Sequence, residues 1–302
     1  MLPTLVVITG PTAVGKTKLC VELAQYFNCD IISADSRQFF KELSIGTAKP
    51  TIDEMQDVNH HFVNSHSILD NYNVTDFEQD VLHLLPTLFK QNPLVILTGG
   101  SGLYIDAICN GFDDNLPESN NKIRAELATL YHKYGIEVLQ TKLKQLDPNF
   151  YHEIDLSNVN RLYRAIEVCI LTGKPYSDLR QGIKQVRPFN IIKIGLNRER
   201  EDLFGRINLR VDNMLNTGLL EEVKNVIDHK DKNALKTVGY RELFDYLEGT
   251  CSLDHAIEKI KVNSRRYAKR QLVWFNRDND YHWFHPNEKE LIIKYIEHQL
   301  IA

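Results

Sequence analysis

The segment Gly10-Pro-Thr-Ala-Val-Gly-Lys-Thr17 constrains this chain more than any other part of its sequence. It fits the pattern G-x-x-x-x-G-K-[ST] of a phosphate-binding loop, or P-loop. Residues 4–9 before it form a continuous apolar run typical of a buried strand, and residues 16–27 repeat apolar side chains on one helical face. Since the motif requires a strand, a turn and a helix in this order, the context disfavours a chance glycine-rich turn. The sequence predicts binding of a diphosphate or triphosphate, such as ATP.

In such a loop, backbone N–H groups and the helix N-terminus surround phosphate oxygens. The Lys16 ammonium would neutralise phosphate charge, and the Thr17 hydroxyl can ligate Mg²⁺. The predicted diphosphate-binding residues are Gly10, Pro11, Thr12, Ala13, Val14, Gly15, Lys16 and Thr17.

Further apolar runs at 30–33, 94–97 and 190–196 read as strands of the same sheet. Strands that alternate with helices indicate a parallel sheet, in which ligands bind outside the carboxyl ends of the strands. We therefore predict an α/β fold with a P-loop NTPase-like parallel sheet core, a helical insertion domain and a helical C-terminal region.

The insertion is predicted from a change of pattern after a polar connector at 113–121. Helical periodicity follows it, and Thr172-Gly-Lys-Pro175 is a helix stop. We expect residues 1–112 and 190–302 to form the core with its C-terminal helices, and residues 113–189 to form the insertion.

Composition narrows the class of protein. The chain has 302 residues, a net charge of −4, and five cysteines without a CxxC pair, which suits a reducing compartment. Its apolar segments are shorter than the roughly 20 residues that span a bilayer. The apolar run near the N-terminus is too short for a signal peptide. We expect a cytoplasmic protein that does not enter membranes and is a monomer.

A P-loop does not reveal the fate of the phosphates, which can be transferred or can leave. Many nucleotide hydrolases carry an Asp at a strand end to organise Mg²⁺. Here the run 94–97 ends in Thr98-Gly-Gly-Ser101, which weakens an ATPase or GTPase reading but leaves a small-molecule kinase open. Asp35, just after the run 30–33, can be a general base, a metal ligand or simply a turn residue, and its spacing does not decide between them.

Taken in order, several segments resemble the tRNA dimethylallyltransferase, or tRNA isopentenyltransferase, family of bacterial type. They span nearly the whole chain and are GPTAVGKT (10–17), SADSRQFF (33–40), IGTAKP (45–50), TGGSGLY (98–104), NRLYRAIEV (160–168), TGKP (172–175), RINLRVDNML (206–215), TVGYRE (237–242) and RRYAKRQLVWF (265–275).

The resemblance implies transfer of a dimethylallyl group from dimethylallyl diphosphate to N6 of the adenosine next to the anticodon (position 37), in tRNAs that read codons beginning with U. The P-loop would bind the diphosphate with Mg²⁺. Asp35 matches the family's general base, and Arg210 matches an arginine assigned to the diphosphate. Ser101 replaces the usual threonine near the reactive centre and keeps its hydroxyl, whereas Asn158 replaces a frequent aspartate. We expect the target adenine to leave the anticodon stack.

The resemblance also implies contacts with the tRNA anticodon stem-loop. The residues concerned are Asp35, Ser36, Arg37, Gln38, Ser101, Arg124, Asn160, Arg161, Leu162, Tyr163, Arg164, Lys236, Thr237, Val238, Gly239, Tyr240, Arg241, Arg265, Arg266, Lys269 and Arg270.

Two other patterns have more than one interpretation. Between Lys261 and Arg277 the chain carries basic residues and no acidic one, which suits either tRNA phosphates or a solvated helix face with its aromatic residues in the core. Adjacent His60 and His61 point in different directions on a strand or helix, which favours structural histidines over a metal pair.

Two alternatives to the transferase stay open. A P-loop small-molecule kinase explains the loop and Asp35, but not the segments IGTAKP and AKRQ. A nucleotide-gated RNA-binding module predicts tRNA affinity without modification.

Overall fold

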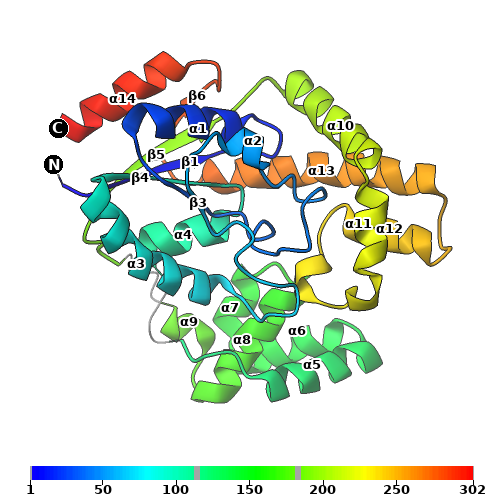
Figure 1. Ribbon diagram of the computed structural model, residues 1–302. Helices are drawn as coiled ribbons and strands as arrows, with labels where there is room; N and C mark the ends of the chain where they lie inside the picture. Colours follow the sequence, from blue (N-terminus) through cyan, green and yellow to red (C-terminus); the bar gives the residue numbers. More distant parts are fainter. Residues whose placement is uncertain (1, 112–115, 181–184, 302) are drawn as a thin grey trace. The chain divides into compact units, whose positions relative to one another are not determined.

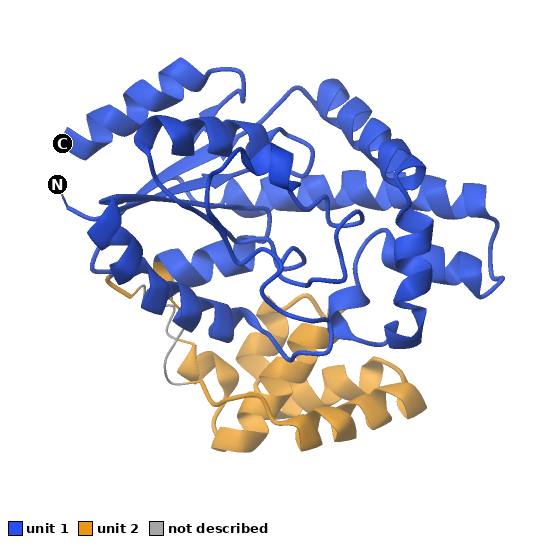
Figure 2. Cartoon of the chain, in the orientation of Figure 1, with its two compact units in different colours: residues 1–109, 187–302 blue, residues 110–186 orange. Residues whose placement is uncertain are grey.

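The computed structural model describes residues 2–111, 116–180 and 185–301. The chain forms two compact units, drawn in different colours in Figure 2. Unit 1 comprises Met1–Cys109 and Arg187–Ala302, and unit 2 comprises Asn110–Val186. The insertion predicted at 113–189 therefore corresponds to most of unit 2, with both boundaries displaced toward the N-terminus.

A parallel sheet forms the centre of unit 1 (Figure 1). In the described residues its strand order is β3-β2-β4-β1-β5-β6, and each neighbouring pair is parallel. The four runs predicted as strands correspond to β1 (Thr4–Thr9), β2 (Ile31–Ser33), β4 (Leu94–Gly99) and β5 (Asn190–Leu196). The short edge strands β3 (His60–His61) and β6 (His282–Phe284) were not predicted.

Helices cover both faces of this sheet, because successive side chains of a buried strand point to opposite sides. From β1, Val6 and Ile8 pack in one core with α1 (Lys16–Phe27) and α14 (Lys289–Ile301). Leu5 and Val7 pack in the other with α3 (Val74–Gln91) and α4 (Gly102–Asn110). Figure 1 shows these pairs of helices on opposite sides of the sheet. The sheet core is therefore α/β, as predicted.

A third core lies among the C-terminal helices of unit 1. It combines residues of α10 (Arg200–Asn216), α11 (Leu219–Asn225), α12 (Tyr240–Leu247) and α13 (Leu253–Phe275) with Phe40 and Leu43. Two 3-10 turns, Ile227–His229 and Asn233–Leu235, and the short helix α2 (Ile52–Met55) complete the described elements of this unit. The helical C-terminal region is confirmed.

Unit 2 is helical and has its own core. Its helices are α5 (Asn121–Tyr134), α6 (Glu137–Leu146), α7 (Pro148–Glu153), α8 (Val159–Thr172) and α9 (Tyr176–Leu179). Leu127, Leu139, Leu143 and Leu162 are buried there. Among the described residues of both units, no helix is both long and apolar enough to span a bilayer.

Candidate active site

The P-loop lies between β1 and α1, as predicted. Gly10, Ala13 and Gly15 have φ angles of 148°, 64° and 111°. A Cβ at position 10 would lie 2.6 Å from the backbone oxygen of Leu196, so β5 leaves room only for glycine there. The Lys16 ammonium donates to the carbonyls of Gly10, at 2.8 Å, and Pro11, at 3.0 Å. Burial is the main cause that lowers the pKa of Lys16 to about 8; Asp35 acts to raise this pKa and Arg210 acts to lower it.

Two arginines that were not predicted as site residues bind backbone carbonyls of the P-loop. The Nε atom of Arg198 donates to the Val14 carbonyl at 2.7 Å, and that of Arg206 donates to the Ala13 carbonyl at 2.9 Å. Since the C=O and N–H of one trans peptide point in opposite directions, the Gly15 N–H is turned away from Arg198. Both arginines lie in or just before α10, and in the sequence only the cluster of basic residues there could have indicated a contact with the P-loop.

Asp35 follows β2, and Ser101 follows β4. Because these strands are neighbours in parallel register, Ser33 is paired with Thr98 and the two loops meet. The backbone N–H of Ser36 donates to the Ser101 hydroxyl at 3.0 Å, and that hydroxyl donates to the Ser36 hydroxyl at 3.1 Å. Asp35 accepts from the Arg37 N–H at 3.0 Å. The structure thus brings together the carboxyl ends of β1, β2 and β4, after which the sequence places the P-loop, Asp35 and Ser101.

The electrostatics also place Asp35 beside the cationic groups of the site. Burial lowers the pKa of Arg210, whereas the nearby Asp35 carboxylate acts in the opposite direction. Burial raises the pKa of the Tyr267 phenol to about 12, and Asp35 contributes to that rise. A carboxylate, Lys16 and Arg210 are therefore close enough to interact.

A cavity of about 340 Å³ opens within unit 1 at this point. Its polar lining residues are Thr12, Asp35, Ser36, Arg37, Thr47, Arg210, Lys236, Thr237, Arg241, Ser264, Tyr267 and Arg270. Its remaining lining is mostly apolar and comprises Gly46, Ile207, Val211, Met214, Leu219, Val238, Gly239 and Ile260. The cavity therefore combines polar groups, suited to phosphate and a nucleobase, with apolar side chains.

The segment 236–241, predicted to contact tRNA, contributes to this cavity, but Tyr240 does not. Its side chain is fully buried and donates from its hydroxyl to Glu222 at 2.6 Å. A contact of this side chain with tRNA is therefore corrected to a structural role. Glu222 also accepts from the backbone N–H groups of Ser44, Ile45 and Gly46, at 2.8, 2.7 and 2.9 Å.

Gln38 also makes internal contacts. Its amide accepts from the Ser33 hydroxyl at 3.1 Å and donates to the carbonyls of Thr47, at 3.3 Å, and Ala48, at 3.2 Å. These bonds hold the loop 45–48 beside the end of β2. The predicted contact of Gln38 with tRNA stays a prediction.

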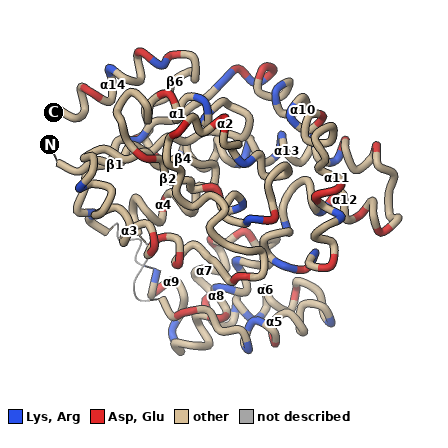
Figure 3. The backbone as a smooth tube through the Cα atoms, in the orientation of Figure 1, with Lys and Arg blue, Asp and Glu red and all other residues tan. Residues whose placement is uncertain are grey.

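The basic stripe predicted from Lys261 to Arg277 lies largely on α13; Lys and Arg are blue in Figure 3. Parts of it have internal partners: Lys261 pairs with Asp212 at 2.8 Å, Arg265 donates to Asn208, and Lys269 lies over the Phe204 ring. Arg266 is exposed, and Arg270 lines the cavity. Phe275 is buried in the core, as the structural interpretation expects.

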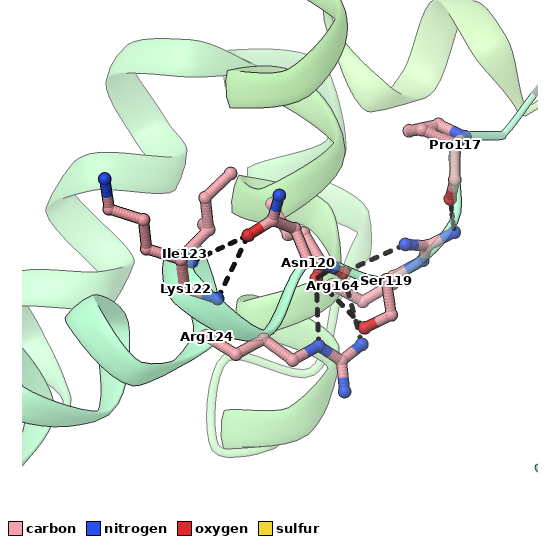
Figure 4. Close-up of polar contacts among 8 residues, drawn as sticks. Pro117, Ser119, Asn120, Lys122, Ile123, Arg124 and Arg164 are labelled. Atoms are coloured by element: carbon pink, nitrogen blue, oxygen red, sulfur yellow. Dashed lines mark hydrogen bonds and ion pairs between the residues drawn. The ribbon is translucent and has the colours of Figure 1, made fainter.

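In unit 2, Arg124 and Arg164 both bind the buried carboxylate of Glu167 (Figure 4). Their distances to it are 3.0 and 2.9 Å, and Arg164 also donates to the Pro117 carbonyl at 2.7 Å. Burial opposes ionisation of Glu167, but hydrogen bonds from the two arginines lower its pKa overall. The two arginines therefore have a structural role, whatever they contact in addition.

The remaining predicted contacts of unit 2 lie on α8. Asn160 and Arg161 are exposed and Tyr163 is half-buried, whereas Leu162 is fully buried in the core. A side-chain contact of Leu162 with tRNA is thus corrected to a packing role. Asn158 caps α8 by accepting from the Arg161 N–H at 3.2 Å, so the amide performs the capping that an aspartate would.

The two adjacent histidines have structural partners. His60 Nδ1 lies 2.9 Å from the Val58 carbonyl, and His61 Nε2 lies 2.8 Å from Asp30. Across the described part of the chain, no three His, Cys, Asp or Glu side chains form a metal-binding group. The metal interpretation of this pair is not supported.

Comparisons with known proteins identify the family of this chain. The family model described as IPP transferase matches residues 38–278. The tRNA dimethylallyltransferase of Flavobacterium johnsoniae is 50% identical over 303 residues, covering 98% of both chains, and tRNA dimethylallyltransferase 1 of Bacteroides fragilis is 48% identical over 97% of both.

Solved structures give the same answer. The full-length tRNA isopentenylpyrophosphate transferase of Bacillus halodurans has a TM-score of 0.73 at 37% identity, covering 99% of this chain and 97% of that one. A eukaryotic dimethylallyltransferase acting on tRNA has a TM-score of 0.77 at 25% identity, covering 94% of this chain and 74% of that one. From these matches and the P-loop site, the chain belongs to the IPP transferase family, which includes the tRNA dimethylallyltransferases.

Proposed function

We propose that this chain transfers the dimethylallyl group of dimethylallyl diphosphate to N6 of the adenosine next to the anticodon (position 37) of tRNAs that read codons beginning with U, and releases diphosphate. One observation carries the proposal beyond family membership. Asp35, Arg210 and Thr12 of the P-loop line one cavity together with apolar side chains. Such a cavity suits a substrate that joins a charged diphosphate to a short hydrocarbon.

The chemistry divides between these groups. The P-loop N–H groups, Lys16 and Arg210 bind the diphosphate and stabilise the charge that it gains as the allylic C–O bond breaks. The N6 electron pair forms the new bond to the allylic carbon, and the C–O electron pair leaves with the diphosphate. Asp35 accepts the proton that N6 loses, and the Ser101 hydroxyl holds the loop of Asp35 through Ser36.

We include Mg²⁺ in this proposal as the counterion of the diphosphate. The residue that would hold it is Thr17, in the first turn of α1, where a hydroxyl is half-buried beside the cradle. A hydroxyl suits Mg²⁺, which prefers oxygen ligands and completes its octahedron with phosphate oxygens and water. When bound, the ion would neutralise charge on the leaving group.

For the acceptor, we propose contacts from residues 35–38, the segment 236–241, exposed residues of α13 and the exposed residues of α8. The adenine amine must reach Asp35 within the cavity, so the base has to leave the anticodon stack. We also propose a monomer that acts where tRNA is modified, in the cytoplasm.

The test is nucleoside mass spectrometry. Purified protein, Mg²⁺, dimethylallyl diphosphate and unmodified tRNA are incubated, and the digested tRNA is compared with a sample that lacks the donor. A mass gain on the adenosine at position 37 is expected. A parallel incubation with γ-labelled ATP and candidate acceptors examines the kinase alternative. Phosphate transfer without prenylation, or tRNA binding without any modification, would contradict the proposal.

A further inference from the structure

Gln271 of α13 lies between the P-loop and the loop that follows β4. Its side chain is buried, with the residue 5% exposed. The amide oxygen accepts from the backbone N–H of Thr12 at 2.8 Å, and the amide nitrogen donates to the backbone carbonyl of Gly100 at 2.8 Å. One amide therefore ties together two loops that are far apart in sequence.

These bonds continue into the loop of the general base. Gly100 precedes Ser101, whose hydroxyl accepts from the Ser36 N–H at 3.0 Å, next to Asp35. The path from the diphosphate cradle to Asp35 thus runs through Thr12, Gln271, Gly100, Ser101 and Ser36. Its middle member is an amide whose oxygen accepts from one loop and whose nitrogen donates to the other. A carboxylate would replace the donor by an acceptor facing the Gly100 carbonyl.

Gly100 shows how closely the amide is fitted. A Cβ at this position would lie 2.2 Å from the amide nitrogen of Gln271, well inside contact distance. A side chain at position 100 would therefore displace the amide of Gln271, although the backbone there is not left-handed, since Gly100 is not among the glycines with positive φ.

We propose that Gln271 is a positioning residue of the transfer reaction, which sets the separation between the diphosphate cradle and the loop of Asp35. The inference rests on the proposed function and adds a role for a residue that contacts no reacting atom. Misplacement of reacting groups lowers turnover even when binding survives. Loss of the amide should therefore lower kcat more than it weakens tRNA binding.

The experiment compares Gln271→Met, which keeps the size but removes both bonds, and Gln271→Glu, which keeps the acceptor for Thr12. We expect kcat to fall by about tenfold or more for both variants, since glutamate turns an acceptor toward the Gly100 carbonyl, with the tRNA Kd within about twofold. Gln140→Met is the matched control, since it removes an amide bond to the Leu156 carbonyl in unit 2. It should leave kcat unchanged.

Gly100→Ala provides an independent probe. It should lower kcat about tenfold when Gln271 is present, but by less than about twofold in a Gln271→Ala background, where the amide no longer meets the new methyl. A purely structural role predicts instead a lower Tm and a smaller active fraction with a normal kcat and additive effects. That result, or a normal kcat in Gln271→Met, would overturn the inference.

Inorganic diphosphate with Mg²⁺ separates failure of the inference from failure of the proposed function. If the unmutated protein makes no prenylated nucleoside, the proposed function is wrong. Diphosphate affinity, measured by calorimetry, then still reports on the cradle. A normal affinity in Gln271→Met would show in that case that the amide does not position the P-loop, whereas a loss of about tenfold would support the positioning role.

Discussion

At the scale of single residues, the site depends on how Asp35 is oriented. Its carboxylate accepts from the Arg37 N–H, and the adjacent Ser36 is bound to Ser101. These bonds limit the rotation of the loop and leave the second carboxylate oxygen for a substrate proton.

Asp35→Asn keeps this shape but removes the basicity of the side chain. Since a positioned general base typically contributes about 10²–10⁴ in rate, we expect kcat to fall by about that factor while tRNA affinity is retained. Single-turnover prenylation and a filter-binding assay measure the two quantities. Asp30→Asn is the matched control, because Asp30 pairs with His61 near the start of the same strand. Near-normal turnover of Asp35→Asn would remove the residue from the base role.

Lys16 gives a prediction for pH. Burial lowers its pKa to about 8 in the free protein, so the cationic form that binds diphosphate is lost as the pH rises above that value. Donor affinity should be constant below about pH 8 and fall about tenfold per pH unit well above it, as binding then requires uptake of one proton. Calorimetry of inorganic diphosphate binding in buffers of different ionisation enthalpy measures that proton.

In Lys16→Arg the decline near pH 8 should disappear, because arginine stays protonated. The same decline in the arginine variant would assign the pH dependence to another group.

At the scale of residues, the sequence predicts the P-loop but not which side chains are buried or bind its backbone. The P-loop could be predicted because its spacing follows from the phosphate that it binds. Tyr240 and Leu162 stand within segments that resemble the family, which is why tRNA contacts are predicted for them, but both side chains are buried. A motif segment contains residues that pack in the core as well as residues that are exposed to a ligand. Arg198 and Arg206 bind backbone carbonyls. Every residue type has a backbone carbonyl, so the sequence does not indicate which carbonyl an arginine binds.

At the scale of secondary structure, α13 combines two roles. One face carries Gln271 and Phe275 into the interior of unit 1, while the other carries exposed basic residues. The same helix therefore supports the cradle and presents positive charge.

Arg266→Ala tests the exposed face. Its guanidinium is exposed and donates to the Asn263 side-chain oxygen over a long 3.4 Å, which does not indicate a role in folding. We expect weaker tRNA binding and a salt-dependence slope smaller in magnitude by about one, as expected for loss of one phosphate contact. Lys259→Ala is the charge-matched control on the same helix, where Lys259 pairs with Asp245. Equal losses for both variants would indicate general charge rather than a contact.

Element boundaries followed the strength of the pattern. The runs at 4–9, 94–97 and 190–196 were found because buried parallel strands are continuously apolar. The strands β3 and β6 have two and three residues and contain histidines, so hydrophobicity alone could not indicate them. They add to sheet edges that the central strands already define.

At the scale of the whole molecule, each unit has its own core, and Glu167 joins α8 to the start of α5 in unit 2. Glu167→Gln should destabilise unit 2 by about 2 kcal/mol, because two arginines lose a charged acceptor, although solvent reaches both. Hydrogen exchange of α5 and α8 amides measures this loss.

Trp274 and Trp283, the two tryptophans of the chain, lie in unit 1, so tryptophan fluorescence reports on the unfolding of unit 1 and not of unit 2. Their fluorescence should show an unchanged unfolding midpoint, and inorganic diphosphate should bind normally. If Glu167→Gln lowered both the hydrogen-exchange protection of unit 2 and the unfolding midpoint of the tryptophan fluorescence, the two units would unfold as one.

The carboxylate of Glu222 has a consequence for how a donor enters. Three successive N–H groups at 44–46 form a receptor for negative charge, and this receptor is already filled by a side chain of the same protein. Gly46 of that loop and Thr12 of the P-loop both line the cavity. On the proposed function, a diphosphate in this cavity finds the N–H groups at 44–46 already occupied and the P-loop still open to it, so the negative Glu222 side chain would set the head-to-tail direction of the donor.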